Sequence, residues 1–361
     1  MKEQLARLAQ RCREALRGVG ERAARWWRRW RGRDRILQPG RTLRLDASAF
    51  GGRLSAWPLL PPRRSFELYL PAGAAADTAI PLLVWIHGCR QDAVGFAAGT
   101  RIRRHADERG IAVLMPDQTR LANPMRCWNW FDPATADGRG EAAIVLAQVE
   151  QVRALQAIDP RRIWIAGLSS GAALAAAVAI HSPQRFGALA CHSGLPAGAA
   201  RNVREARKAM AEGTRRDVAA IGAAARARAG EVHLPMLVIQ GMDDATVAPA
   251  NADALVAQAL AVNGAAATGA TPPKPDAERR HRFESRTVHE ADWLVEGRLA
   301  ARCLRIDGLG HAWSGGDAAH DYFDAALPEA TALILDFFAD QGRRQAGRPP
   351  DISPKGTGNG H

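Results

Sequence analysis

The feature that most constrains the fold is the alternation of short apolar runs with longer helical patterns. Apolar runs rich in β-branched residues lie at 66–70, 81–87, 111–116, 162–167, 187–193, 234–241 and 301–308. Helical periodicity occurs at 94–109, 140–157, 171–182, 250–262 and 328–340. Continuous apolar strands that alternate with helices are typical of a parallel sheet buried on both faces. The sequence therefore predicts an α/β domain over residues 41–340, with a mostly parallel central sheet and helices on both faces.

The two ends of the chain and one internal segment differ from this pattern. Residues 1–40 form a basic arm that holds most of the net charge of +12. Within it, Leu, Val and Trp recur every three or four residues over 4–31, which predicts an amphipathic helix. Residues 265–285 are rich in Pro, Ala, Thr and charge, and predict a mobile insertion loop. The tail, 341–361, lacks periodicity and is expected to be disordered.

Two interpretations of the basic arm stay open. Trp and Arg on one helix suit an anionic, apolar surface such as a membrane. The alternative, which we favour, is a helix that packs on the domain or on a second subunit, or an arm that stays disordered. The first residues contain no continuous apolar segment of the kind found in secretory signals.

Composition excludes several other classes of protein. The chain is 47% hydrophobic and 24% charged, as in an ordinary globular protein. It has no apolar run of about 20 residues, so no transmembrane helix is predicted. Its five cysteines include no CxxC pair, so neither a disulfide scaffold nor a metal site is expected. Outside the arm the charges nearly balance, and nucleic acid is not an expected partner.

One strand–helix junction carries a motif with a chemical meaning. The segment Gly167-Leu168-Ser169-Ser170-Gly171 fits the G-x-S-x-G nucleophile elbow. Its glycines allow the sharp turn that lifts a serine clear of the backbone. An apolar strand precedes it and an Ala-rich helix follows, so Ser169 is the predicted nucleophile rather than a simple helix cap.

A serine nucleophile needs a histidine to take its proton and an acid to orient that histidine. In this fold class the acid and then the histidine follow the serine along the chain. His311 lies in a glycine-flanked turn after the 301–308 strand and is the best placed histidine, with His320 as the reserve. Asp243 and Asp244 both follow the 234–241 strand. Spacing alone favours Asp244 only slightly, so the acid stays open.

The oxyanion of an acyl-transfer reaction needs backbone N–H donors. One is expected to be the amide of Ser170, directly after the nucleophile. The second is expected in the loop after the 81–87 strand, at Cys89. His87 precedes the serine in sequence, so we expect it to fix this loop rather than to act as the base.

Several blocks together resemble a known family. They are, in order, HGCRQDAVGFAAGTR, RCWNWF, GRGE, GLSSGAALAA, HSGLPAGAAR, GMDDATV and RIDGLGHAWSGG. Over roughly residues 65–340 they resemble the polyhydroxybutyrate (PHB) depolymerase-like esterases of the α/β-hydrolase superfamily. Feruloyl and acetylxylan esterases are neighbours of this family. The resemblance implies an α/β-hydrolase fold and a carboxylic-ester hydrolase of a secreted or granule-related type. It also implies a Ser-Asp-His triad and no cofactor.

The resemblance also bears on individual residues. The family's nucleophile and histidine fall on Ser169 and His311, and its acid falls on Asp244, which is thereby favoured over Asp243. It suggests a Cys89–Cys127 disulfide, which requires an oxidising compartment. The alternative is two small buried thiols.

The substrate is left less defined than the chemistry. Trp128, Trp130 and Trp313 are predicted to line the substrate cleft, with core packing as an equal alternative. Polymer depolymerases of this kind usually carry a signal peptide and a polymer-binding domain, and neither is visible. Short hydroxyalkanoate esters or oligomers are therefore the expected substrates. Feruloyl or acetylxylan esters are the alternative.

Two further questions concern partners and place. Residues 1–36 could serve as an anchor to an anionic membrane or a polyester granule. A non-enzymatic alternative is a granule- or membrane-binding protein that uses an inactive hydrolase body. The compartment is left open, because the family suggests an extracellular protein whereas no signal is visible.

Overall fold

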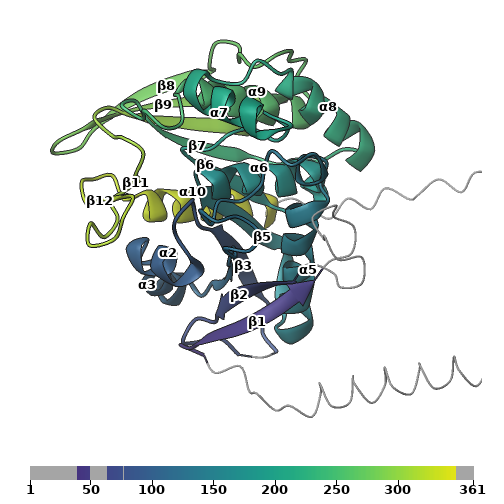
Figure 1. The fold of residues 1–361 in the computed structure, drawn as a ribbon, viewed down its shortest axis with the longest axis vertical. Coiled ribbons are helices and arrows are strands. Elements are labelled where there is room, and N and C mark those ends of the chain that lie inside the picture. Colours follow the sequence, from purple (N-terminus) through teal and green to yellow (C-terminus); the bar gives the residue numbers. More distant parts are fainter. Residues whose placement is uncertain (1–38, 49–62, 76, 347–361) are drawn as a thin grey trace, which may run out of the picture. The chain divides into compact units, whose positions relative to one another are not determined.

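The computed structural model describes residues 39–48, 63–75 and 77–346 (Figure 1). The chain divides into two units, Met1–Gln38 and Pro39–His361. The first unit lies wholly outside the described residues, and so do the predictions made for residues 1–36. The description below concerns the second unit.

A single large sheet organises the described part of the chain. Its ten strands lie in the order β1-β2-β4-β3-β5-β6-β7-β10-β9-β8. The strands are β1 (Thr42–Ser48), β2 (Arg63–Tyr69), β3 (Ile80–Ile86), β4 (Ala112–Pro116), β5 (Ile158–Leu168), β6 (Ala188–His192), β7 (Met236–Gly241), β8 (Ala277–Arg282), β9 (Thr287–Val295) and β10 (Arg298–Ile306). Pairing is parallel from β4 to β10 and antiparallel at both edges. A separate pair, β11 (Trp313–Ser314) and β12 (Phe323–Asp324), is also parallel.

Helices cover both faces of this sheet (Figure 1). One face packs in a large apolar core against α2 (Ala93–Gly99), α3 (Ile102–Arg109) and α10 (Ala330–Ala346). The other face contacts α5 (Gly140–Leu155), α6 (Ser170–His181) and α9 (Ala250–Val262). The remaining helical segments are α4 (Pro133–Ala136), the 3-10 turn η1 (Pro183–Arg185), α7 (Val203–Glu212) and α8 (Val218–Ala229). The predicted α/β class, with its mostly parallel sheet, is confirmed.

The core strands lie where the apolar runs predicted them, whereas the departures lie at the edges. The range 265–285 was expected to be a loop but contains strand β8. Most residues of β8 are exposed and charged, so the strand carries no hydrophobic alternation to reveal it. The predicted helix 94–109 is broken at Thr100–Arg101, where Arg101 takes a left-handed φ of 54°. Helix α10 continues into the range 341–361, which was expected to be disordered.

The fold gathers its functional loops at one edge. Because the central strands are parallel, the loops that follow β3, β5, β7 and β10 all start from their carboxyl ends. These loops carry Cys89, Ser169, Asp244 and His311 in turn. Among the described residues, no helix is both long and apolar enough to cross a membrane.

Candidate active site

The turn between β5 and α6 holds Ser169 in an uncommon backbone conformation. Its φ of 55° and ψ of −120° are rarely adopted by residues other than glycine. A Cβ atom on Gly167 would come within 2.5 Å of the Gly171 carbonyl carbon, and one on Gly171 within 2.3 Å of the His87 carbonyl oxygen. Both glycines of the motif are therefore required by close backbone packing. The Ser169 amide donates to the carbonyl of His192 over 2.9 Å.

The three residues predicted as a triad are brought together. His311 Nε2 lies 3.0 Å from Ser169 Oγ, and His311 Nδ1 lies 2.8 Å from Asp244 Oδ2. The other carboxylate oxygen of Asp244 accepts the amides of Thr246 and Val247 at 2.9 and 2.8 Å. The structure places no carboxylate but that of Asp244 on His311 among the described residues. The reserve histidine, His320, lies against Phe323 instead.

Hydrogen bonds keep the carboxylate of Asp244 ionised. Burial alone would raise the pKa of Asp244, but hydrogen bonds from His311 and from the Val247 and Thr246 amides hold it below its usual value. The neighbouring His192 is fully buried. Burial, reinforced by the nearby His311, lowers the pKa of His192 to about 3. His192 is therefore neutral near pH 7 and adds no charge beside the triad.

The loops that carry the acid and the base are joined to each other by the backbone. The amide of Met242 donates to Ile306 and that of Asp243 to Leu309, each over 3.0 Å. A Cβ on Gly241 would lie only 2.2 Å from the Leu309 carbonyl oxygen. This close approach explains the glycine at the end of β7 and fixes the separation of Asp244 from His311.

The predicted oxyanion donors lie beside the nucleophile. A Cβ on Gly88 would be 3.5 Å from the Ser169 Cβ, which places the loop after β3 against the elbow. Ser170 is the first residue of α6, so its amide has no acceptor within the helix. The Cys89 amide donates to no acceptor within the described part of the chain. Two free amides therefore lie next to Ser169, as an oxyanion hole requires.

Cys89 is also joined to Cys127 by a disulfide in the structure. The Cys89 sulfur lies 3.4 Å from Ser170 Oγ, so the side chains of the two predicted donor residues are in contact. Cys191 and Cys303 are free and buried. Burial raises the pKa of the Cys303 thiol to about 11, which fits an inert core position.

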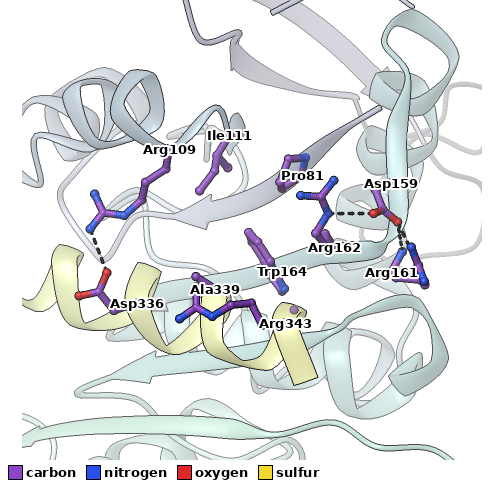
Figure 2. Close-up of a pocket in the computed structure, with 11 residues that line it drawn as sticks. Pro81, Arg109, Ile111, Asp159, Arg161, Arg162, Trp164, Asp336, Ala339 and Arg343 are labelled. Carbon is purple, nitrogen blue, oxygen red and sulfur yellow. Dashed lines mark hydrogen bonds and ion pairs between the residues drawn. The ribbon is translucent and has the colours of Figure 1, made fainter. Parts of the chain in front are cut away.

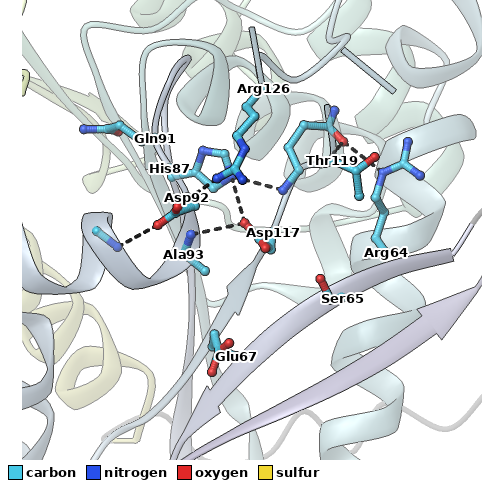
Figure 3. A network of polar contacts seen from close by, with 12 residues as sticks. Arg64, Ser65, Glu67, His87, Gln91, Asp92, Ala93, Asp117, Thr119 and Arg126 are labelled. Carbon is cyan, nitrogen blue, oxygen red and sulfur yellow. Dashed lines mark hydrogen bonds and ion pairs between the residues drawn. The ribbon is translucent and has the colours of Figure 1, made fainter. Parts of the chain in front are cut away.

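A buried carboxylate supports this side of the site, and sequence reasoning missed it. Glu141, 1% exposed, accepts the Asn129 amide at 2.7 Å and the Gln118 side-chain amide at 2.6 Å. It also pairs with Arg64 at 3.5 Å. Nearby, Arg126 donates to Asp92 over 2.8 Å (Figure 3). The GRGE block, which contains Glu141, was the one feature of the sequence that pointed to this residue. A single acidic residue at the start of a helix does not show which groups it will contact in the fold.

The three tryptophans predicted to line the substrate cleft are buried, which favours the alternative of core packing. Trp313 is fully buried and donates its indole N–H to Thr331, and Trp128 is 1% exposed and donates to the His87 carbonyl. Trp130 is 4% exposed and packs in a second apolar cluster. The indole N–H groups of Trp128 and Trp313 and the ring of Trp130 thus have partners inside the protein, as buried aromatic side chains require.

A pocket of about 630 Å³ lies at the opposite end of the sheet (Figure 2). It is lined by residues at the start of β3 and β5, including Pro81 and Asp159, whereas Ser169 follows the far end of β5. Its arginines are paired with acids, as Arg109 is with Asp336 and Arg162 with Asp159. The nucleophile, base and free amides are all elsewhere, so this pocket is not the candidate active site. Among the described residues, no group of His, Cys, Asp or Glu side chains is arranged to hold a metal ion.

Comparisons with known proteins show which proteins this chain is similar to. The family model described as "Esterase PHB depolymerase" matches residues 64–282, more than half of the chain. The chain is 32% identical over 195 residues to poly(3-hydroxyalkanoate) depolymerase C of Paucimonas lemoignei, a match covering 53% of the chain and 46% of that protein. It is 30% identical over 145 residues to feruloyl esterase B of Neurospora crassa, covering 40% of the chain and 48% of that protein. The chain thus spans about half the length of these curated relatives.

A solved structure shows the same fold. The acetyl xylan esterase from Aspergillus awamori aligns with a TM-score of 0.62 at 18% identity, covering 82% of this chain and 99% of that one. At this identity the likeness concerns the fold alone. It agrees with the α/β-hydrolase architecture expected from the sequence.

Proposed function

The chain belongs to the esterase PHB depolymerase family and is a serine esterase, and from this premise we propose that Ser169, His311 and Asp244 are its catalytic triad. The observation that carries the proposal is the continuous chain of contacts, 3.0 Å from serine to histidine and 2.8 Å from histidine to aspartate. Nucleophile, base and orienting acid need this order and these distances.

The reaction proceeds in two acyl-transfer steps. His311 Nε2 takes the hydroxyl proton while Ser169 Oγ bonds to the ester carbonyl carbon, and the electron pair of the C=O bond moves to oxygen. The Cys89 and Ser170 amides donate to this oxyanion. When the carbonyl re-forms, the C–O bond to the alcohol breaks and His311 protonates the leaving alcohol. Water, deprotonated by His311, then releases the acid and regenerates Ser169. The ionised Asp244 stabilises the imidazolium formed in each step.

We propose short-chain hydroxyalkanoate esters and oligomers as the substrates. The 32% identity to a poly(3-hydroxyalkanoate) depolymerase supports this choice. A second candidate is a feruloyl or acetylxylan ester, and the feruloyl esterase of Neurospora crassa supports the first of these two. Initial rates on hydroxybutyrate oligomers, methyl ferulate and acetylated xylan separate the two. A preference in kcat/KM for either plant ester overturns the hydroxyalkanoate assignment without affecting the triad.

The triad itself is tested with Ser169→Ala. We expect it to abolish hydrolysis of p-nitrophenyl butyrate and labelling by a fluorophosphonate probe, while leaving thermal unfolding near that of the wild type. Activity near wild type in this variant rejects Ser169 as nucleophile. A wild-type protein that neither hydrolyses esters nor reacts with the probe favours the binding-protein alternative.

We further propose that residues 1–36 attach the enzyme to an anionic membrane or a polyester granule. The concentration of basic residues and tryptophans in this segment supports the proposal. Co-sedimentation of the full chain and of a deletion of residues 1–36 with anionic vesicles and with PHB granules tests it. Equal sedimentation of the two proteins contradicts it.

A further inference from the structure

We propose that the cavity at the amino ends of β3 and β5 is a binding site for a small carboxylate with an apolar body. This cavity of about 630 Å³ lies between the start of the sheet and the last turns of α10 (Figure 2). Its volume is in the range of sites that bind small molecules. It is separate from the candidate active site, because Trp164 on its wall lies roughly 13 Å along β5 from Leu168, the residue before the nucleophile.

The first observation is a buried indole N–H without a partner. Trp164 is 3% exposed, and its ring stacks on Phe338 of α10 at 5.5 Å between centroids. Its Nε1 atom has no acceptor in the described part of the chain, whereas the Trp85 indole donates to Thr100 and the Trp293 indole to Pro273. A buried donor that lacks an acceptor is unfavourable. A ligand oxygen that reaches this N–H from the cavity would therefore be bound.

The second observation is a glycine that leaves space beside this N–H. Gly342 lies inside α10, where glycine lowers helix stability relative to alanine. Packing does not require it, because a Cβ there would be 3.5 Å from Trp164 Cζ2 and 3.8 Å from Arg162 Cδ, which are ordinary contacts. Cζ2 is bonded to the ring carbon that carries Nε1. Any other residue at position 342 would thus add cover over the edge of the ring that holds the N–H.

The walls of the cavity carry more positive than negative charge. The charged side chains that line it are Arg109, Arg161, Arg162, Arg343, Asp159 and Asp336. Asp159 is shared, since its carboxylate lies 2.8 Å from Arg162 Nε and 3.6 Å from Arg161 Nε. Arg161 is 66% exposed and keeps donors for a ligand. A carboxylate accepts hydrogen bonds from guanidinium groups and from an indole N–H alike.

The remaining lining of the cavity is apolar. Pro81, Ile111 and Ala339 lie beside Trp164 and offer no polar side-chain group. A ligand that fills the cavity therefore contacts an apolar surface as well as charged groups. This combination favours an alkyl or aryl carboxylate over an inorganic anion.

Hexanoate tests the proposal, with 1-hexanol and inorganic phosphate as probes that each carry only one of its two features. The full chain is first treated with a fluorophosphonate, which closes the candidate active site by labelling Ser169. We expect titration calorimetry to give hexanoate a Kd of about 1–10 mM, with the other two probes at least about fivefold weaker. Absence of hexanoate binding, or equal binding of phosphate, overturns the proposal.

Three substitutions then locate the bound hexanoate. Gly342→Leu fills the space beside the indole and should weaken binding at least about fivefold, while it raises Tm by about 1–3 °C because a glycine leaves the helix. Trp164→Phe keeps a ring but removes the N–H, and Arg162→Gln removes a charge. Each should weaken binding about threefold to tenfold.

Arg153→Gln is the matched control for Arg162→Gln. Both arginines are 39% exposed and pair with an acid three residues earlier in the chain. The control should leave the affinity for hexanoate within about twofold of the wild type. Wild-type affinity in both Gly342→Leu and Arg162→Gln overturns the proposal, even if Trp164→Phe fails to fold. If the fluorophosphonate labels nothing, the proposed nucleophile is in error, and the same variants still report on this cavity.

Discussion

The two sides of Ser169 offer different kinds of functional group, a backbone amide on one side and two side chains on the other. On one side, the loops after β3 and β4 present a backbone amide, and they are held by a disulfide, by the buried Glu141 and by His87. On the other, the loops after β7 and β10 present the side chains of Asp244 and His311, joined by backbone hydrogen bonds. One hydrogen bond to its terminal polar group can orient a side chain. A backbone N–H is oriented only together with its whole peptide unit, so the carbonyl group and the neighbouring residues must be held instead.

The two strands that flank β5 show the same division. Each ends near a buried histidine, His87 after β3 and His192 at the end of β6. His87 contacts the oxyanion loop, whereas His192 accepts the Ser314 amide over 3.4 Å and stacks on Trp313 at 4.9 Å, close behind His311. The pair suggests that the edge of the sheet carries one neutral histidine for each half of the site.

The largest effect is expected on the side-chain half, at Asp244. Asp244→Asn keeps the shape of the acid but removes the charge that stabilises the His311 imidazolium, and it favours the wrong tautomer. We expect kcat to fall by about 10³- to 10⁴-fold. The adjacent Asp243→Asn is a matched control, because its side chain is exposed, and it should change kcat by less than about twofold. Comparable losses in both variants would mean that the acid was wrongly assigned.

The next effect is expected on the backbone half, at Glu141. Glu141→Gln keeps the volume but removes the charge that faces Arg64 and one acceptor of the Asn129–Gln118 network. We expect the free energy of unfolding in urea to fall by about 2–3 kcal/mol, with a smaller loss of kcat. Glu150→Gln is the control, since Glu150 pairs with Arg153 and Arg185 on an exposed surface and should cost about 0–1 kcal/mol. Equal losses would remove the distinction between a buried support and a surface pair.

The Cys89–Cys127 disulfide also holds the backbone half of the site, so its removal is the third prediction. Cys127→Ser opens a loop of 38 residues, and the unfolded chain gains freedom worth about 3–4 kcal/mol in the chain-entropy model. Because the Cys89 side chain is then released, we expect kcat to fall about threefold to tenfold while KM changes little. Treatment of the wild type with a dithiol reductant should reproduce the loss, and Cys303→Ser, at a free cysteine, should not reduce kcat. Unchanged kcat after reduction would show that backbone bonds alone hold this loop.

The same contrast explains what could be predicted from the sequence. Ser169 and His311 could be predicted because each follows an apolar strand and carries a reactive group at a position that the chain order dictates, whereas the choice of Asp244 over Asp243 needed the family resemblance. His87 was expected to fix the loop after β3, but its hydrogen-bond partners, like those of Glu141, depend on which loops meet in space, and neither periodicity nor spacing contains that information. The choice between cleft and core for the three tryptophans stayed open for a related reason, since an aromatic residue near a motif gives the same sequence pattern in either place. β8 was missed because a charged edge strand lacks the apolar alternation that marks a half-buried one.

The last effect is a dependence of stability on pH that should appear at the other buried histidine. The pKa of His192 is about 3 in the folded protein, below its ordinary value near 6.5. Between these values the unfolded chain binds a proton at this site that the folded chain does not, so stability falls as pH falls from about 6.5 towards 3. One such group contributes a slope of up to about 1.4 kcal/mol per pH unit.

His192→Asn should therefore flatten the fall in unfolding free energy measured in urea between pH 6 and pH 4, because it removes one titrating group. Trp313→Phe is the control, since it disturbs the same stack and lowers stability but removes no proton site. If both variants keep the wild-type slope, the imidazole is not held neutral by burial. In that case His87 and His192 resemble each other only in their positions beside β5, and not in being neutral.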